Sequence, residues 1–305
     1  MRVSLVSPLT IGLSPREASE IPYGDAPLGV LTLAAVARNQ GHIVQFADLD
    51  YLSHHLPVDH FAVEAANWIA DARADLYGFG TICDSYPLTL RVAREVARLC
   101  PAAKIILGGP QASVTDLEVL LALPEVDLVV RGEAEETFAA LLQKMEAGHD
   151  WSKLPGLTLW GPFGPQRTAV APLLSNLDII PDPAWDLDPV FAQRPDASVE
   201  MGRGCPFACD FCSTNDFFRR KYRMKSPARV LGQMAEIARR YGFRKFSLVH
   251  DMFTVDRRRV LAFCTAAEQM GSPFEWGCSA RTDCLDEALL ERMYAAGCRK
   301  LFFGV

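Results

Sequence analysis

Short apolar segments alternate with longer amphipathic segments along most of this chain. In the first half, runs of apolar residues predict five β-strands, at 2–7, 42–48, 75–80, 104–109 and 127–132. Apolar positions at helical spacing predict the helices that follow them, at 27–41, 60–73, 87–100, 116–123 and 133–148. Strongly apolar strands that alternate with helices predict an α/β fold with a doubly wound parallel sheet, a Rossmann-like (flavodoxin-like) domain over residues 1–147.

A proline-rich segment follows at 148–198 and contains eight of the chain's twenty prolines. This density disfavours long helices and predicts a linker between two domains. Within it, residues 157–170 predict a small hairpin with a Gly-Pro turn. Residues 177–189 predict an extended apolar segment that lies across the following domain, with Trp185 as a packing anchor.

The alternation of strands and helices resumes over residues 199–305. Strands are predicted at 197–202, 245–250, 274–280 and 299–305, and helices at 226–242, 256–271 and 286–297. For the first helix, Ser226 is the expected N-cap, Pro227 the first helical position and Gly242 the stop. This repeat is typical of a βα barrel, in which functional residues collect on the loops after the strands.

The loop after the first of these strands carries the most specific chemistry in the chain. The segment MGRGCPFACDFCS at 201–213 places Cys205, Cys209 and Cys212 in a CxxxCxxC pattern. A four-iron cluster has four ligand positions, usually filled by thiolates, so three cysteines leave one iron able to bind a small molecule. Gly202 and Gly204 suit a backbone that turns sharply and packs closely against something bulky.

Other uses of three cysteines have to be considered beside the cluster. Zinc knuckles more often combine CxxC pairs with a fourth Cys or His close by. No second pair follows here, and the nearest histidine is the distant His250. A structural zinc site remains the main alternative, and a disulfide is the other.

The cysteine loop resembles the radical S-adenosylmethionine (SAM) superfamily, whose signature is CxxxCxxC with an aromatic residue, here Phe211, before the third cysteine. The segment RGCPFACDFCS is most similar to the branch of this superfamily whose members carry a cobalamin-binding domain ahead of the radical SAM barrel. The segments APLGVLTLAA, ILGGPQAS and VVRGEAEETF in the first half are similar to that branch too. The resemblance implies three cofactors: a [4Fe-4S] cluster bound by Cys205, Cys209 and Cys212, SAM, and cobalamin.

In the first domain, the resemblance places cobalamin beyond the carboxyl ends of the strands. The cobalamin-binding residues that it implies lie in the loops after the third, fourth and fifth strands: Gly80, Thr81, Gly108, Gly109, Gly132 and Glu133. The chain departs from the wider cobalamin family because the DxHxxG motif that supplies a histidine to cobalt is absent. Cobalt would then have no histidine ligand or a different residue, and the alternative is a Rossmann-like domain without a cofactor.

In the second domain, the resemblance makes Phe211, Asp251 and Arg281 candidates for contacts to SAM, because the strand ends of that family face the cluster and SAM. A surface salt bridge is the competing interpretation of Arg281. Asp256 and Asp283 are interpreted as N-caps of the helices that follow them. The remaining cysteines of this half are interpreted as small core residues: Cys264, Cys278, Cys284 and Cys298.

The function that the resemblance implies is reductive cleavage of SAM followed by methyl transfer to an unactivated carbon. Ring rearrangement and oxidative cyclisation are possible on the same scaffold. Two other interpretations stay open: a radical SAM enzyme without cobalamin, such as a methylthiotransferase-like protein, and a non-catalytic iron–sulfur or zinc protein. The implied partners are a small-molecule or peptide substrate and an external electron donor of the flavodoxin or ferredoxin type.

Composition and charge bear on the protein's partners and on its location in the cell. The net charge of −6 argues against non-specific nucleic-acid binding, and nine cysteines without a secretory signal predict a reducing, cytoplasmic location. No apolar run approaches the roughly 20 residues that span a bilayer. The strand repeat reaches Val305 before a radical SAM barrel would be complete. We therefore expect a fragment, a barrel completed by another chain, or an incomplete site.

Overall fold

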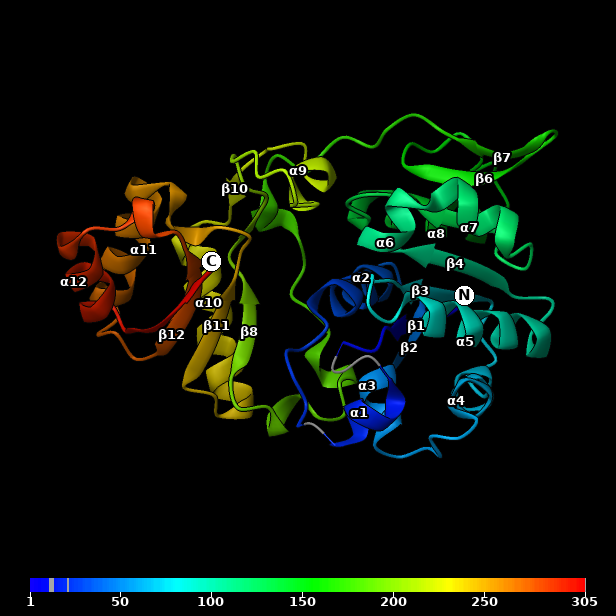
Figure 1. Ribbon diagram of the computed structural model, residues 1–305, viewed down its shortest axis with the longest axis horizontal. Helices are drawn as coiled ribbons and strands as arrows, with labels where there is room; N and C mark the ends of the chain where they lie inside the picture. Colours follow the sequence, from blue (N-terminus) through cyan, green and yellow to red (C-terminus); the bar gives the residue numbers. More distant parts are fainter. Residues whose placement is uncertain (11–13, 21, 305) are drawn as a thin grey trace. The chain divides into compact units, whose positions relative to one another are not determined.

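The structure, a computed structural model, describes residues 1–10, 14–20 and 22–304. The chain forms two compact units (Figure 1). The first comprises Met1–Leu173 and Pro181–Val190, and the second comprises Leu174–Ile180 and Phe191–Val305. The segment expected as a linker at 148–198 is thus divided between the units instead of standing apart from both.

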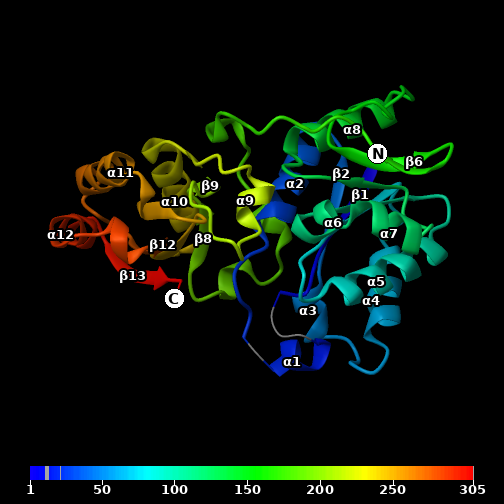
Figure 2. The ribbon, with the colours of Figure 1, turned by 45° about the horizontal axis from the view of Figure 1, so that its top comes forward.

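The first unit is built on a seven-stranded sheet in the order β2-β1-β3-β4-β5-β6-β7. Its strands are β1 (Arg2–Ser7), β2 (Ile43–Asp48), β3 (Leu76–Gly80), β4 (Lys104–Gly108), β5 (Leu128–Val130), β6 (Leu157–Gly161) and β7 (Gly164–Arg167). The first five are parallel, and their order 2-1-3-4-5 is that of flavodoxin-like folds, so the predicted fold class is confirmed. β6 and β7 confirm the predicted hairpin and extend the sheet with antiparallel pairing at one edge (Figures 1 and 2).

Helices cover both faces of this sheet because the strand residues alternate between two apolar cores. Val3 and Leu5 belong to the core under α2 (Leu28–Asn39) and α8 (Glu135–Glu146), whereas Val6 belongs to the opposite core. The opposite face carries the other helices: α1 (Pro15–Glu20), α3 (Leu49–Ser53), α4 (Phe61–Ala70), α5 (Tyr86–Leu99), α6 (Pro110–Val114) and α7 (Asp116–Ala122). Three of them, α1, α3 and α6, are short helices that the hydrophobic pattern did not predict.

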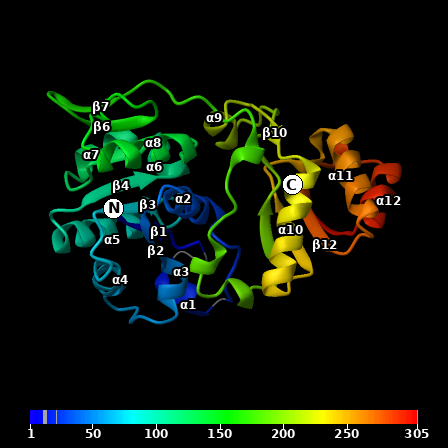
Figure 3. The same cartoon turned by 180° about the vertical axis from the view of Figure 1, so that it is seen from behind.

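The second unit is built on a four-stranded parallel sheet in the order β13-β12-β11-β8. Its strands are β8 (Ala197–Glu200), β11 (Lys245–Val249), β12 (Glu275–Ala280) and β13 (Cys298–Phe303), with a separate antiparallel pair of β9 (Gly202–Arg203) and β10 (Arg223–Met224). The helices α10 (Pro227–Tyr241), α11 (Arg257–Gln269) and α12 (Glu287–Ala295) lie on one side of the sheet (Figure 3). Sequential parallel strands joined through helices give this arrangement, which is the predicted beginning of a βα barrel.

Short elements complete the two units. They are the helix α9 (Thr214–Phe217) and the 3-10 turns at Leu177–Ile179, Trp185–Leu187, Phe191–Gln193, Phe253–Val255 and Thr282–Cys284. Trp185 is 3% exposed and packs as predicted, but in the first unit, where Ala184 N donates to Leu31 O at 3.0 Å. In the described part of the chain, no helix is both long and apolar enough to cross a membrane.

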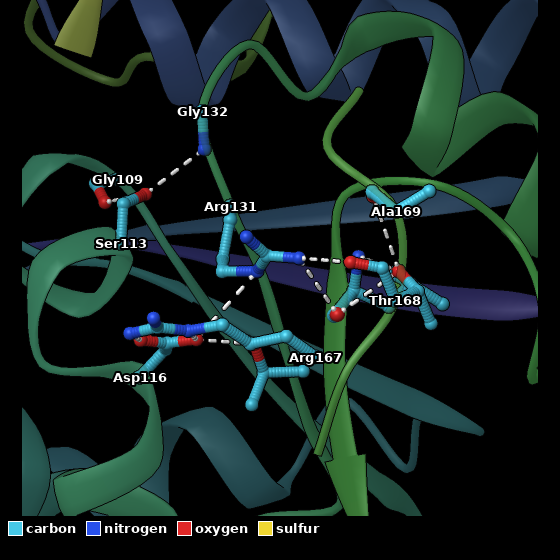
Figure 4. A network of polar contacts seen from close by, with 10 residues as sticks. Gly109, Ser113, Asp116, Arg131, Gly132, Arg167, Thr168 and Ala169 are labelled. Carbon is cyan, nitrogen blue, oxygen red and sulfur yellow. Dashed lines mark hydrogen bonds and ion pairs between the residues drawn. The ribbon is translucent and has the colours of Figure 1, made fainter. Parts of the chain in front are cut away.

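An ion pair between a buried carboxylate and a half-exposed arginine attaches the β6–β7 hairpin to the rest of the first unit (Figure 4). The carboxylate of Asp116 is fully buried and accepts two hydrogen bonds from the guanidinium of Arg167, at 2.8 and 2.5 Å. It also accepts from the Thr158 hydroxyl and lies 3.6 Å from Nε of Arg131. Burial by itself would raise the pKa of Asp116, but these hydrogen bonds and charges outweigh it, so that pKa lies below its ordinary value.

Replacing Asp116 by Asn is expected to destabilise the first unit by about 3–5 kcal/mol, because Arg131 keeps a buried charge without its counterion. Since the folded-state pKa of Asp116 is lowered, its contribution is complete above the unfolded value of about 3.9 and is lost as pH falls through the folded value. Hydrogen exchange of the β6–β7 backbone in increasing urea measures the effect. The matched control is Asp186→Asn, which weakens the half-exposed pair in which Nη1 of Arg38 donates to both carboxylate oxygens, and it should change stability by at most about 1 kcal/mol. Equal effects of the two variants would contradict the prediction.

Candidate functional site

The three cysteines of the CxxxCxxC pattern lie on one loop at the carboxyl end of β8, between β9 and α9. All three are free thiols and partly buried. The amide of Cys212 donates to the carbonyl of Cys209 at 3.1 Å. Burial raises the pKa of the Cys205 thiol, and Asp251 and the thiols of Cys212 and Cys209 raise it further. The side chains therefore lie close enough to influence one another electrostatically.

The glycines of the loop are required by close backbone packing, as the sequence predicted. Gly204 has φ +81°, and a Cβ on it would lie 2.2 Å from the carbonyl oxygen of Lys221. A Cβ on Gly202 would lie 2.3 Å from the carbonyl oxygen of Arg223. Both contacts are shorter than real Cβ atoms show, so the loop rests directly on the backbone around β10. The bulky neighbour of these glycines is thus the chain itself.

Asp251, a predicted SAM contact, lies after β11 and holds the cysteine loop. Its Oδ2 accepts from the amide of Gly204 at 2.6 Å, and its Oδ1 accepts from the hydroxyl of Thr214 at 3.2 Å. The residue stays accessible to solvent, yet surrounding protein atoms partly desolvate the carboxylate and raise its pKa, while these two hydrogen bonds act in the opposite direction. Its two oxygens are therefore already engaged with both ends of the loop.

Arg281, the second predicted SAM contact, packs on the middle of the loop. Its guanidinium lies 3.9 Å from the centre of the Phe207 ring, a cation–π contact. It also donates two hydrogen bonds to Asp283, at 2.9 and 2.7 Å. The pKa of Arg281 is raised by these bonds and by the carboxylate's charge. The structure thus contains the salt bridge considered for Arg281, and adds a ring contact to the loop.

The expected cap at Asp283 is wrong, because Asp286 caps α12 by accepting from Leu289 N, whereas Asp283 lies in a 3-10 turn. The other expected caps, Asp256 on α11 and Ser226 on α10, are confirmed. Phe211, the third predicted SAM contact, is 93% exposed and presents its ring to solvent beside Cys212.

A buried charge cluster under the cysteine loop was missed by the sequence analysis. Glu200, the last residue of β8, accepts from Arg203 at 2.7 Å and from Lys225 at 3.0 Å, and Lys225 is 3% exposed. Burial alone would raise the pKa of Glu200, but the two cations keep it below its ordinary value. His250 lies beside this cluster, and burial lowers its pKa to about 4, so it is neutral. Charged residues at the ends of apolar strands were the signal that could have revealed the cluster.

The glycines predicted to face cobalamin come together at the carboxyl edge of the first sheet. The hydroxyl of Thr81 donates to Gly108 O at 2.8 Å and accepts from Ala112 N at 2.9 Å. Thr81 is 1% exposed, so its side chain joins the loops after β3 and β4 and does not form their surface. Gly109 has φ +95°, and a Cβ there would lie 2.6 Å from Thr81 O.

A second hydroxyl joins the loops after β4 and β5 (Figure 4). Ser113 Oγ donates to Gly109 O at 2.7 Å and accepts from Gly132 N at 3.0 Å. Gly80, Gly108, Gly109 and Gly132 are all partly exposed, whereas Glu133 is 8% exposed. The edge is therefore a glycine-lined backbone surface that two hydroxyl groups hold together. A large ligand can approach such a backbone closely.

The residues present fit the cofactors that the sequence implies. Three free, partly buried thiols on one braced loop form a donor set of the kind that iron–sulfur clusters use. In residues 1–10, 14–20 and 22–304, no group of three or more His, Cys, Asp or Glu side chains is arranged to hold a single metal ion. The glycine-lined edge offers backbone that a large ligand can approach closely, and the GxGxxG motif of a dinucleotide site does not follow β1.

Comparison with known proteins assigns both halves of the chain. Residues 20–142 match the B12 binding domain family, and residues 199–305 match the radical SAM superfamily. An uncharacterized methyltransferase, PH0819, of Pyrococcus horikoshii is 28% identical over 92% of this chain. The anaerobic magnesium-protoporphyrin IX monomethyl ester cyclase of Cereibacter sphaeroides is 29% identical over 90% of it. The chain spans 60% and 46% of the length of these two relatives.

Solved structures share the fold of the whole chain. The radical SAM methyltransferase TsrM of Kitasatospora setae superposes with a TM-score of 0.80 over 99% of this chain and 59% of its own, at 17% sequence identity. The cobalamin-dependent radical SAM enzyme OxsB superposes with a TM-score of 0.79 over 100% of this chain and 44% of its own, at 18% identity.

Proposed function

We propose a function for this chain on the basis of its family. The chain belongs to the radical SAM superfamily and carries a B12-binding domain ahead of its radical SAM domain. The proposed activity is reductive cleavage of SAM, coupled to cobalamin-dependent methyl transfer to an unactivated carbon of a small-molecule substrate. The observation that carries the proposal is the loop of three free, partly buried thiols at the end of the first barrel strand. Relatives named as methyltransferases support the methyl-transfer outcome.

Cys205, Cys209 and Cys212 are the proposed ligands of a [4Fe-4S] cluster. When bound, the cluster supplies the electron that cleaves SAM, and cobalamin supplies the methyl group. The chain's own contribution is to hold three thiols at one strand end, with Gly202 and Gly204 allowing the loop to lie on the backbone around β10. Burial and nearby thiols oppose loss of the Cys205 proton, so the thiolate there depends on metal binding.

Phe211 and Arg281 are the proposed SAM-facing groups of the chain, together with Asp251. The exposed ring of Phe211 offers an apolar surface beside the third cysteine. The Arg281 guanidinium is fixed by Phe207 and Asp283, so its positive charge is held near the loop in one geometry. Asp251 lies beside the cysteine loop, because its carboxylate accepts hydrogen bonds from Gly204 N and Thr214 Oγ1.

Gly80, Thr81, Gly108, Gly109, Gly132 and Glu133 form the proposed cobalamin-binding edge. The four glycines offer backbone surface, while Thr81 and Ser113 fix the relative positions of the three loops. Glu133 is buried and lies next to the Gly132 turn, where it contributes to the shape of the edge. We propose cytoplasmic location and a flavodoxin- or ferredoxin-type electron donor, because free thiols and a reducible cluster both require reducing conditions.

Oxidative cyclisation is a second candidate outcome. Three relatives are named as anaerobic magnesium-protoporphyrin IX monomethyl ester cyclases, and one is 30% identical over 68% of this chain. Cyclisation and methylation share SAM cleavage and differ in what happens to the substrate afterwards. The mass of the product separates them, because methylation adds one carbon and cyclisation adds none.

The test is anaerobic reconstitution of the 305-residue chain with iron, sulfide and hydroxocobalamin, followed by addition of SAM and a strong reductant. We expect about four irons per chain, a cobalamin absorption spectrum that stays with the protein, and release of 5′-deoxyadenosine or S-adenosylhomocysteine. SAM products without bound cobalamin would favour a radical SAM enzyme of another type. A reconstituted chain that binds a four-iron cluster and cobalamin but consumes no SAM would contradict the proposed activity.

A further inference from the structure

We propose that Asp251 is a positioning residue that fastens both ends of the cysteine loop to strand β11 and sets the loop's geometry before any cluster is bound. The inference deepens the proposed function, because it concerns the loop that is proposed to bind the cluster. It gives this carboxylate a role in addition to the proposed contact to SAM. The relevant atoms are Asp251 Oδ1 and Oδ2, Gly204 N and Thr214 Oγ1.

The hydrogen bond to Gly204 is the stronger attachment. Gly204 is buried, so its amide needs a partner inside the protein, and the Asp251 carboxylate provides it at 2.6 Å. The glycine's φ of +81° directs the chain into the turn that leads to Cys205. The carboxylate therefore acts one residue before the first proposed ligand.

The second attachment lies two residues after the last proposed ligand. Thr214 begins α9, and its hydroxyl donates to the other Asp251 oxygen at 3.2 Å. One carboxylate at the end of β11 thus joins the loop's entry and its exit, although residues 204 and 214 are ten positions apart. Its two hydrogen bonds reduce the conformational freedom that the loop would otherwise lose on binding a cluster.

Other contacts brace the middle of the loop. Asn215, 8% exposed, donates from Nδ2 to the carbonyl of Cys209 at 3.3 Å, and Arg281 covers the Phe207 ring. These contacts hold single points, whereas Asp251 connects the loop to the sheet at both ends.

The test compares Asp251→Asn with the matched control Asp210→Asn, which removes the same charge from an exposed position inside the loop. Hydrogen exchange of peptides covering residues 204–214 is measured on the iron-free chain, and iron retention against a chelator on the reconstituted chain. Asp251→Asn is expected to speed exchange at least about tenfold and to shorten the half-life of bound iron by a similar factor. Asp210→Asn should match the wild type in both. Wild-type exchange and wild-type iron retention in Asp251→Asn would overturn the proposal.

Thr214 supplies a second pair of variants in case Asp251→Asn folds poorly. Thr214→Val removes one attachment and should give a smaller increase in exchange, whereas Thr214→Ser keeps the hydroxyl and should restore it. The exchange measurement decides the proposal even if the chain binds no four-iron cluster, because it uses the iron-free protein. Normal exchange and iron retention in Asp251→Asn, together with lost SAM cleavage, would instead assign Asp251 as a SAM contact and overturn the positioning role.

Discussion

Replacing Cys205, Cys209 and Cys212 by serine, singly or together, is expected to abolish the four-iron cluster and lower SAM cleavage at least about 1,000-fold. A serine hydroxyl has nearly the shape of the thiol but is not a thiolate donor, so the folded chain should be preserved while the ligand set is lost. All three thiols are partly buried at the surface of one loop, which limits the effect on packing. Iron and sulfide analysis with electron paramagnetic resonance of the reduced protein measures the outcome.

Two other cysteines serve as controls for this prediction. Cys83→Ser changes an exposed thiol in the first unit and should leave the cluster intact. Cys284→Ser is the sharper control, because this partly buried thiol lies close enough to Cys205 for that thiol to contribute to its raised pKa. A full cluster in Cys284→Ser supports three protein ligands and one open iron. Loss of the cluster in that variant would make Cys284 a fourth ligand and exclude SAM binding at an open iron.

Replacing Gly109 by Ala is expected to weaken hydroxocobalamin binding at least about 100-fold and to destabilise the first unit by about 2–4 kcal/mol. Two effects combine at this position. An L-residue at φ +95° is strained, and the new Cβ would lie 2.6 Å from Thr81 O and 2.9 Å from Thr81 N. Because both neighbours are backbone atoms, the turn after β4 has to move away from the turn after β3. Absorbance titration with hydroxocobalamin measures the affinity, and urea unfolding measures the stability.

Gly148→Ala is the matched control, since Gly148 also has a positive φ, +65°, but lies after α8 with nothing within 4 Å of a Cβ. It should cost about 1 kcal/mol and leave cobalamin affinity unchanged. Ser113→Ala tests the same edge without backbone strain, because it removes only the hydroxyl between Gly109 O and Gly132 N. We expect about three- to tenfold weaker binding. Wild-type affinity in a folded Gly109→Ala protein would show that cobalamin binds elsewhere.

The parallel strands of both units were predictable because strands that are buried on both faces are continuously apolar. Proline content predicted a linker at 148–198, but this segment is divided between the two units. Its prolines correctly excluded long helices, but the hairpin at 157–167 joins the first sheet because β6 pairs with β5, and the paired residues lie 27 to 31 positions apart in the chain. The ion pair that secures it joins Asp116 to Arg167. Pairing between such distant residues leaves no local periodicity in the sequence.

The CxxxCxxC pattern alone identified the loop of the proposed cluster ligands, because the spacing of ligands along the chain can be recognised without knowledge of the fold. The helix caps at Ser226 and Asp256 were equally local and were found, whereas Asp283 was misassigned because Asp286, three residues later, caps α12. The succession of strands and helices along the chain and the glycines that follow the strands of the first sheet were also readable from the sequence. Each of these depends on neighbours within a few residues.

Several functional arrangements depend on residues that are far apart in the sequence. Asp251 reaches Gly204, 47 positions away, and Arg281 reaches Phe207. Ser113 joins Gly109 to Gly132 at the other cofactor edge. These contacts arise because parallel strands bring their carboxyl ends to one edge, where a side chain's partner is set by strand order and not by spacing. The amino-acid sequence therefore specified which chemistry the chain carries, and the folding of its sheets specified which side chains hold that chemistry in position.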